Sequence, residues 1–238
     1  MANDYFSFKQ FTIYQDACAM KVTTDACLFG AWVAQEMEKG EWKIANALDI
    51  GAGTGLLSLM VAQKTAFFID AVEINHSAAQ QAFENISKSS FSGINIIQGD
   101  VLKLPLKKYD CIFSNPPFYE AELASPNTDR STAHHGEGLQ WKDLFRFIAA
   151  HLKSGGIFFL LLPTKRLAEM QKLAYDNGLH IHQRLLVKQT PTHTPFRVMV
   201  SGGKTPGNCL TTEMLIQDAT GGYSPEFVEL LKDYYLYL

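Results

Sequence analysis

The sequence has few cysteines and shows no pairing among them. Cys18, Cys27, Cys111 and Cys209 are scattered along 238 residues, with no CxxC pair and no Cys/His cluster at zinc spacing. We therefore expect free thiols in a reducing compartment, without a disulfide framework and without a bound metal.

Long apolar stretches and a targeting segment are also missing. The longest apolar run, GIFFLLLP at 156–163, is far shorter than the ~20 residues of a membrane-spanning helix. The start, MANDYFSFKQ, has neither the basic nor the apolar region of a secretory signal. With 47% hydrophobic and 19% charged residues, the composition favours one soluble globular domain, which we expect in the cytoplasm.

The chain has no excess of positive charge either. Its formal net charge is −3 and its pI is near 6.2, so any nucleic-acid-binding surface has to be local. Each basic side chain taken alone is more often a solvated surface group, and only a group of them around one site would form such a surface. The candidates are Lys103, Lys107, Lys108, Arg130, His134, His135, Lys165 and Arg166. We expect Lys103, Lys107, Lys108 and Arg130, with basic residues further along the chain, to surround residues 114–118.

Short apolar segments alternate with helical patterns of about 10–15 residues. This βαβ pattern is typical of a parallel sheet covered by helices. Strands are predicted at 46–50, 67–74, 94–100, 109–115 and 156–163, and helices at 56–64, 77–86, 141–152, 166–178 and 224–238. Two final strands, at 180–189 and 195–204, predict one antiparallel pairing at an edge of the sheet.

A glycine-rich turn connects the first strand to a helix. In LDIGAGTGLL, Gly51, Gly53 and Gly55 stand at alternate positions, where positive φ is accessible and a ligand can lie against bare main chain. Glu73 ends the next strand, and its carboxylate can accept hydrogen bonds from both hydroxyls of a ribose. These positions predict a nucleoside-binding site.

The acidic residues near this turn favour a positively charged nucleoside. The spacing is G-x-G-x-G rather than the dinucleotide G-x-G-x-x-G, and Asp49 would repel a pyrophosphate. A cofactor with an ammonium or sulfonium group, such as S-adenosylmethionine, suits that charge. Asp100 ends the third strand, where it can accept the adenine amino group while Val101 or Leu102 packs on the base. Each acid alone is commonly a cap or turn residue, and their placement at successive strand ends is what favours a site.

The fourth strand runs into SNPPF at 114–118. Two prolines end a strand because each lacks an N–H and fixes φ, so an ordinary turn is one interpretation. The other interpretation is catalytic, because an exocyclic adenine amine is a poor nucleophile whose lone pair is delocalised into the ring. The two N–H groups of this amine would donate hydrogen bonds, one to the Asn115 side-chain oxygen and one to the Pro116 carbonyl. These hydrogen bonds would help the nitrogen become tetrahedral. Pro117 stiffens the main chain, and Phe118 offers a face for a flipped base.

Several motifs resemble one family of class I S-adenosylmethionine-dependent methyltransferases, the bacterial tRNA1(Val) adenine-N6 methyltransferases, which modify the adenosine 3′ of the anticodon. The motifs are SNPPF, LDIGAGTGLL, DAVEIN, SPNTDRSTAHHG, KVTTDACLFGAW and YSPEFVELLKDYYLYL, and the resemblance covers almost the whole chain. It implies a seven-stranded, mostly parallel sheet with helices on both faces and one antiparallel edge strand. It also implies S-adenosylmethionine as cofactor and tRNA as substrate, with no membrane and no obligate protein partner.

The resemblance further implies how the N-terminal segment is used. Residues 1–238 would form a single methyltransferase domain in which residues 1–45 cover the cofactor. Lys21, Thr24 and Asp25 would contribute to the cofactor site, and Asn115 would lie beside it. The alternative for Thr24 and Asp25 is that they cap the helix that begins before ACLFGAW.

Four alternative functions have to be weighed at this level. A release-factor methyltransferase would use the same motif on a protein glutamine, although those enzymes usually carry a helical domain before the first strand. Another adenine-N6 methyltransferase would act on rRNA or DNA. A nucleotide-binding oxidoreductase or an inactive binding module is disfavoured by the glycine spacing and by the intact Asn115.

Overall fold

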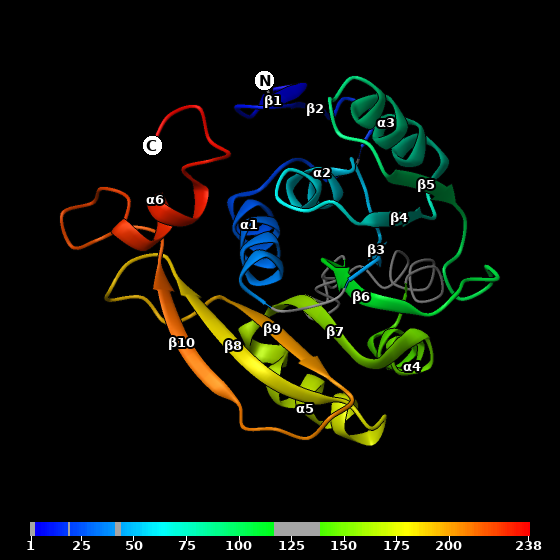
Figure 1. Ribbon diagram of the computed structural model, residues 1–238. Coiled ribbons are helices and arrows are strands. Elements are labelled where there is room, and N and C mark those ends of the chain that lie inside the picture. Colours follow the sequence, from blue (N-terminus) through cyan, green and yellow to red (C-terminus); the bar gives the residue numbers. More distant parts are fainter. Residues whose placement is uncertain (1–2, 19, 41–43, 117–138) are drawn as a thin grey trace, which may run out of the picture.

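The computed structural model describes residues 3–18, 20–40, 44–116 and 139–238. An eight-stranded sheet forms the centre of this part of the chain, in the order β10-β8-β9-β7-β6-β3-β4-β5 (Figure 1). Neighbouring strands are parallel except at β9, which runs antiparallel to β7 and β8. The strands are β3 (Asn46–Ile50), β4 (Phe68–Glu73), β5 (Ile94–Gln98), β6 (Tyr109–Ser114), β7 (Leu152–Pro163), β8 (His180–Lys188), β9 (Arg197–Gly203) and β10 (Leu210–Leu215).

The predicted α/β class with a mostly parallel sheet is confirmed, but two details of the prediction are wrong. The sheet has eight strands rather than seven, and its antiparallel strand β9 is not at an edge. Six of the seven residues of β9 are buried, which fits a strand paired on both sides. The unpredicted β10 forms the edge; four of its six residues are exposed, so it lacks the apolar pattern that identifies a strand in a sequence.

Helices cover both faces of the sheet (Figure 1). One face carries α1 (Thr24–Lys39), α2 (Leu56–Ala62), α3 (His76–Ser87) and α6 (Pro225–Leu231), and the other carries α4 (Trp141–His151), the short 3-10 helix η1 (Thr164–Arg166) and α5 (Leu167–Asp176). Side chains along β7 alternate between the two cores, with Phe159 in the first and Phe158 in the second. Among the helices of the described residues, none combines the length and the apolar character needed to cross a membrane.

The two ends of the chain meet beside α1. Residues before α1 form a small antiparallel sheet of β1 (Tyr5–Ser7) and β2 (Thr12–Tyr14). The Lys9 amide donates a hydrogen bond to the Tyr234 carbonyl at 2.8 Å. The last helix therefore ends at Leu231 rather than at residue 238 as predicted, because the chain turns there to meet the N-terminal segment.

Candidate cofactor site and catalytic site

The glycine loop between β3 and α2 adopts the backbone conformation that its sequence predicts. Gly51, Gly53 and Gly55 have φ of 75°, 55° and 82°, values that residues other than glycine rarely adopt. A Cβ added at Gly51 or Gly53 would meet no described atom within 4 Å, so bare main chain faces open space. At Gly55 the nearest atoms belong to α3, which packs closely against the loop.

Glu73 connects the end of β4 to this loop. Its side chain is only 8% exposed, and its two oxygens accept hydrogen bonds from the amides of Gly53 and Asn75, each at 2.8 Å. A carboxylate accepts about four hydrogen bonds, so acceptor capacity remains for the two hydroxyls of a ribose. The hydrogen bond from Gly53 joins the end of β4 to the glycine loop, a contact that the sequence did not predict.

Asp49 lies fully buried in β3, directly below the loop. Its Oδ2 accepts a hydrogen bond from the Ser58 hydroxyl at 2.7 Å, while no described residue donates to its Oδ1. Burial raises the pKa of Asp49 to about 7; the Ser58 hydrogen bond opposes this shift and the nearby Glu73 carboxylate adds to it. A carboxylate in this position is stabilised by a cationic ligand, as expected for a cofactor with an ammonium or sulfonium group.

Asp100 and Val101 follow β5 at the same edge of the sheet. The Asp100 carboxylate accepts from the Leu102 amide at 3.0 Å and pairs with Lys103 at 3.1 Å. Burial acts to raise the pKa of Asp100, but these two partners outweigh it and hold the pKa below its usual value. Val101 is 6% exposed and Leu102 is 45% exposed, so Leu102 has the larger area available to a base.

Asn115 and Pro116 follow the end of β6, next to β3. The Ser114 hydroxyl donates to the Ile50 carbonyl at 2.7 Å and fastens these two strand ends together. The Asn115 Oδ1 is buried, and none of the described residues donates a hydrogen bond to it. Pro117 and Phe118 lie outside the described residues.

The N-terminal segment packs against α3 and the glycine loop. Asn85 of α3 is 1% exposed, and its amide nitrogen donates to the carbonyls of Tyr14 and Thr54, each at 2.9 Å. Burial, followed by the charge of Glu73, raises the pKa of Cys18 to about 11, in agreement with a position near that carboxylate. Sequence reasoning missed Asn85, although polar residues on the apolar face of a helix, here Gln81 and Asn85, were the available signal.

Lys21, Thr24 and Asp25 lie at the entrance to α1. The Lys21 ammonium donates to the Gln15 carbonyl at 2.6 Å, and Asp25 pairs with Arg197 of β9 at 2.8 Å. Thr24 and Asp25 do not cap the helix: the N-cap is Thr23, whose side chain makes no capping hydrogen bond.

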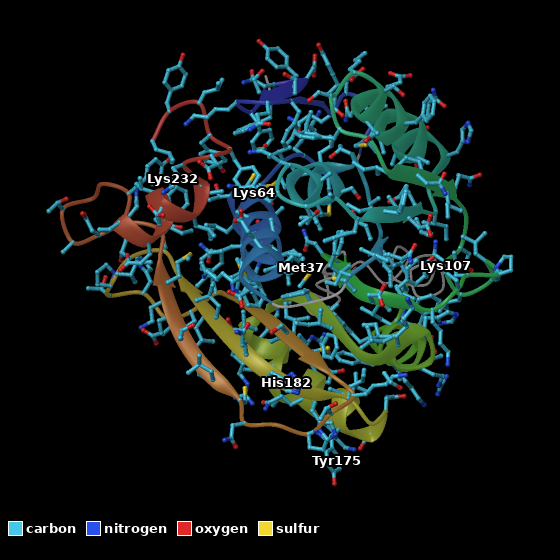
Figure 2. The ribbon with its side chains drawn as sticks, viewed as in Figure 1. Met37, Lys64, Lys107, Tyr175, His182 and Lys232 are labelled. Carbon is cyan, nitrogen blue, oxygen red and sulfur yellow. The ribbon has the colours of Figure 1, made fainter. Side chains whose placement is uncertain are left out.

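The lysines that precede SNPPF in the sequence do not lie beside it. Lys107 and Lys108 come before Tyr109, where β6 begins, whereas Asn115 follows the other end of the strand. Six residues of strand span ~20 Å. Figure 2 shows Lys107 at the starting end of β6, where it pairs with Asp70 at 3.0 Å. The expectation that these two lysines border the catalytic site is therefore wrong.

Other basic residues do lie at the carboxyl ends of the strands. Lys165 and Arg166 directly follow β7; Lys165 is exposed, and Arg166 pairs with Glu169 at 2.9 Å. Lys103 sits at this edge too, paired with Asp100. The remaining candidates lie outside the described residues: Arg130, His134 and His135.

Comparisons with known proteins identify the family of this chain. The model of the methyltransferase small domain family matches residues 31–173. Among curated relatives, a tRNA1(Val) (adenine(37)-N6)-methyltransferase from Bacteroides thetaiotaomicron is 38% identical over 242 residues, covering 100% of both chains. One of the same name from Cronobacter sakazakii is 35% identical, covering 98% of this chain and 95% of the relative.

Solved structures share the fold at low sequence identity. A protein described as a predicted O-methyltransferase from Agrobacterium tumefaciens has a TM-score of 0.63 at 19% identity, covering 88% of this chain and 96% of that one. An S-adenosylmethionine-dependent methyltransferase from Clostridium acetobutylicum has a TM-score of 0.57 at 12% identity, covering 78% and 94%. The chain therefore belongs to the methyltransferase small domain family and, within it, to the family of tRNA1(Val) (adenine(37)-N6)-methyltransferases.

Proposed function

We propose that this protein transfers a methyl group from S-adenosylmethionine to the N6 amine of an adenine in tRNA, the adenosine 3′ of the anticodon in tRNA1(Val). Its family and fold imply the use of S-adenosylmethionine. The names of full-length relatives support the tRNA substrate. No observation on this chain favours a protein glutamine as the methyl acceptor.

The buried Asn115 Oδ1, to which none of the described residues donates a hydrogen bond, is the observation that supports this chemistry most directly. An acceptor buried without a hydrogen bond destabilises a protein by about 1–3 kcal/mol, so such an atom needs an explanation. The N–H of an exocyclic adenine amine would satisfy it. The Pro116 carbonyl would accept the second N–H, and the two acceptors together favour the tetrahedral nitrogen that attacks the methyl group. We propose that Pro117 stiffens this turn and that Phe118 stacks on the flipped base.

The residues around the glycine loop fit S-adenosylmethionine. Gly51, Gly53 and Gly55 would lie against it, and Glu73 would accept hydrogen bonds from its ribose. The buried carboxylate of Asp49 would face its positive charge. When bound, this cofactor supplies an activated methyl group on a sulfonium. At the adenine ring of the cofactor, Asp100 would accept a hydrogen bond from the exocyclic amine, and Val101 and Leu102 would lie beside the ring.

The N-terminal segment would complete the cofactor site. We propose that residues 1–238 act as one domain and that residues 1–45 cover the cofactor, with Lys21, Thr24 and Asp25 at the entrance to α1. Asn85 supports this arrangement because it connects Tyr14 to the glycine loop at Thr54.

A labelling experiment tests the function directly. The protein is incubated with methyl-labelled S-adenosylmethionine and, separately, with total tRNA, a release factor or DNA, and the tRNA products are digested and identified by mass spectrometry. We expect label in N6-methyladenosine of tRNA1(Val), and none in a transcript whose target adenosine is replaced by guanosine. Label in the release factor or the DNA, with unlabelled tRNA, would overturn the proposal.

A further inference from the structure

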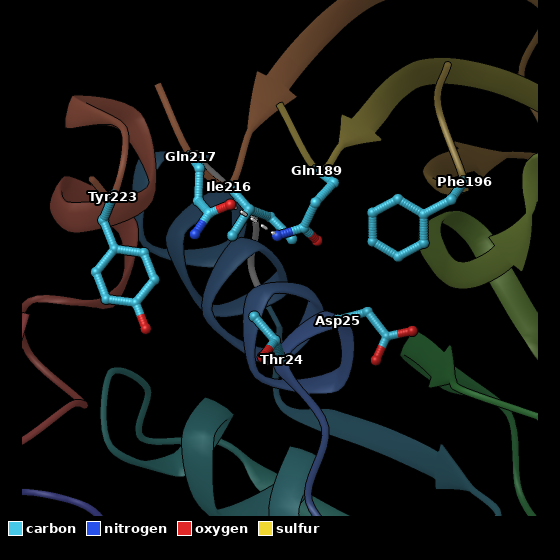
Figure 3. Close-up of a pocket in the computed structure, with 7 residues that line it drawn as sticks. All are labelled: Thr24, Asp25, Gln189, Phe196, Ile216, Gln217 and Tyr223. Carbon is cyan, nitrogen blue, oxygen red and sulfur yellow. Dashed lines mark hydrogen bonds between the residues drawn. The ribbon is translucent and has the colours of Figure 1, made fainter. Parts of the chain in front are cut away.

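A hollow opens beyond β9, at the same edge of the sheet as Asn115. Its volume is about 310 Å³, and its walls come from α1, the β8–β9 connection and the segment between β10 and α6 (Figure 3). Because β8 and β10 both end here, the hollow shares the carboxyl edge of the parallel strands with the glycine loop. The lining residues are Thr24, Asp25, Gln189, Phe196, Ile216, Gln217 and Tyr223.

Two glutamine side chains form one wall of the hollow. The Gln189 Nε2 donates a hydrogen bond to the Gln217 Oε1 at 3.3 Å. The backbones of the two residues are also joined, because the main-chain N–H of Gln217 donates to the main-chain carbonyl of Gln189 at 2.9 Å. No other described residue bonds to these two side-chain amides, so the Gln217 nitrogen and the Gln189 oxygen remain available at opposite ends of the pair (Figure 3). The Gln189 amide keeps its oxygen and one N–H, an adjacent acceptor and donor of the kind that bind a nucleobase edge in a bidentate contact.

Two aromatic rings stand at opposite ends of this wall (Figure 3). Tyr223 is 48% exposed, and its ring stacks on the buried Phe227 with centroids 4.5 Å apart. Phe196 is held by a hydrogen bond from its amide to the Val187 carbonyl at 3.0 Å. The Tyr223 ring is thus held in place while about half of the residue stays accessible, as a stacking surface requires.

The charges around the hollow favour a neutral ligand over a phosphate. Among the described residues that line it, Asp25 alone is charged, and its carboxylate is paired with Arg197 at 2.8 Å. Within the described part of the chain, no lysine or arginine lines the hollow. The Arg197 guanidinium lies 5.5 Å from the centre of the Phe196 ring, but its charge is offset by Asp25. Aromatic faces and paired amides suit a neutral, planar group with hydrogen-bonding edges, which is the chemistry of a nucleobase.

We infer that this hollow holds an unstacked base of the tRNA substrate, one that flanks the target adenosine. The base rests against the Tyr223 ring, and its edge meets the Gln189–Gln217 pair. Neighbouring strands lie about 4.8 Å apart, and β9 and β8 are two and three strands from β6, so the hollow begins roughly 10–15 Å from the strand before Asn115. Nucleotides rise ~3.4 Å each when stacked and extend further when unstacked, so this is a span of a few nucleotides. The inference rests on the proposed function.

Coupling between protein variants and RNA lesions tests this inference. Anticodon stem-loop RNAs are prepared with a single abasic site at each position flanking the target adenosine, and kcat/KM is measured for the wild type, Tyr223→Ala and Gln217→Leu. With the wild type, one abasic position should lower kcat/KM by about 5–150-fold, the scale of one lost base–aromatic stack. With either variant, the intact RNA should already show a loss, and the same abasic site should add less than about threefold.

A matched control is Tyr175→Ala, which removes an exposed tyrosine at the other edge of the sheet, where the β8 arrow begins (Figure 2). It should keep the wild-type pattern, and melting temperatures check that all variants are folded. Two outcomes would refute the base-binding hollow while the proposed function stands. In the first, the losses of kcat/KM from the protein variant and from the abasic site multiply at every position. In the second, no flanking abasic site lowers kcat/KM for the wild type. A wild type that methylates no tRNA would instead overturn the proposed function, and this inference with it.

Discussion

The Glu73 carboxylate accepts a hydrogen bond from the Gly53 amide at 2.8 Å, joining the end of β4 to the middle of the glycine loop. The two residues are 20 positions apart in the sequence, and each has a role in the proposed cofactor site. Glu73 therefore both shapes the loop and stays available to a ribose through its remaining lone pairs. Loss of the carboxylate should therefore affect both the conformation of the glycine loop and the binding of the ribose.

Replacement of Glu73 by alanine should weaken binding of S-adenosylmethionine by roughly 1–3 kcal/mol, the range for hydrogen bonds to a charged group. Isothermal titration calorimetry measures this change. Glu73→Gln is the matched control, because its amide oxygen can still accept from Gly53 while the charge is lost, and its affinity should fall between the two. Unchanged affinity in Glu73→Ala would place the ribose elsewhere.

The buried Asp49 should make stability depend on pH. Its pKa is about 7 in the folded chain, against a usual value of 3.8, so between these values the folded state holds a proton that the unfolded state has released. Stability from this residue is therefore complete below about pH 4 and is lost as pH rises through 7. Asp49→Asn should remove this slope and melt several degrees above the wild type at pH 8, since each kcal/mol shifts the melting temperature about 2–4 °C. If the melting temperatures of the two proteins changed with pH in the same way from pH 4.5 to 8, Asp49 would not be the source of the pH dependence.

The same residue should couple cofactor binding to proton release. A cationic ligand favours the charged form of Asp49, so affinity for S-adenosylmethionine should rise with pH up to about 7 and level off above it. Calorimetry in two buffers of different ionisation enthalpy measures the protons released. Asp49→Asn should release fewer protons at pH 6, and equal release by both proteins would exclude Asp49 as the source.

The position of the lysines relative to the strand ends should decide their effect on RNA binding. Lys165→Ala should weaken tRNA binding and reduce the slope of log affinity against log salt by about one unit, because one phosphate contact is lost. Lys107→Ala is the control: it removes an equal charge at the opposite edge of the sheet and should leave the slope unchanged. A larger effect from Lys107 than from Lys165 would place the RNA on the other edge.

Local patterns in the sequence predicted the parts of the molecule that depend on local chemistry. The glycines of the loop require positive φ, and Glu73 stands at the end of a buried strand, so both were placed correctly. The edge strand β10 was missed because four of its residues are exposed, and Lys107 was misplaced because closeness in sequence ignores the length of β6. The contacts of Asn85 were missed because they join segments that are 31 and 71 residues away.

The last prediction concerns Asn115 and separates chemistry from binding. Its buried Oδ1 is proposed to accept from the amine mainly as the nitrogen becomes tetrahedral, so it should stabilise the transition state more than either bound ligand. Asn115→Ala should lower kcat by roughly 10²–10³-fold, the scale for one preorganised polar group, with little change in cofactor or tRNA affinity. Single-turnover kinetics and equilibrium binding measure the two quantities separately.

Asn115→Asp is the sharper variant, because it keeps an acceptor oxygen at the same place while adding a charge. A carboxylate still accepts the amine N–H, so part of the activity should survive, well above that of Asn115→Ala. If both variants were equally inactive with tRNA affinity intact, the amide nitrogen rather than the oxygen would be the group required. An Asn115→Ala enzyme with the wild-type single-turnover rate would leave SNPPF as an ordinary strand-ending turn, because no acceptor at this position would then be needed to activate the amine.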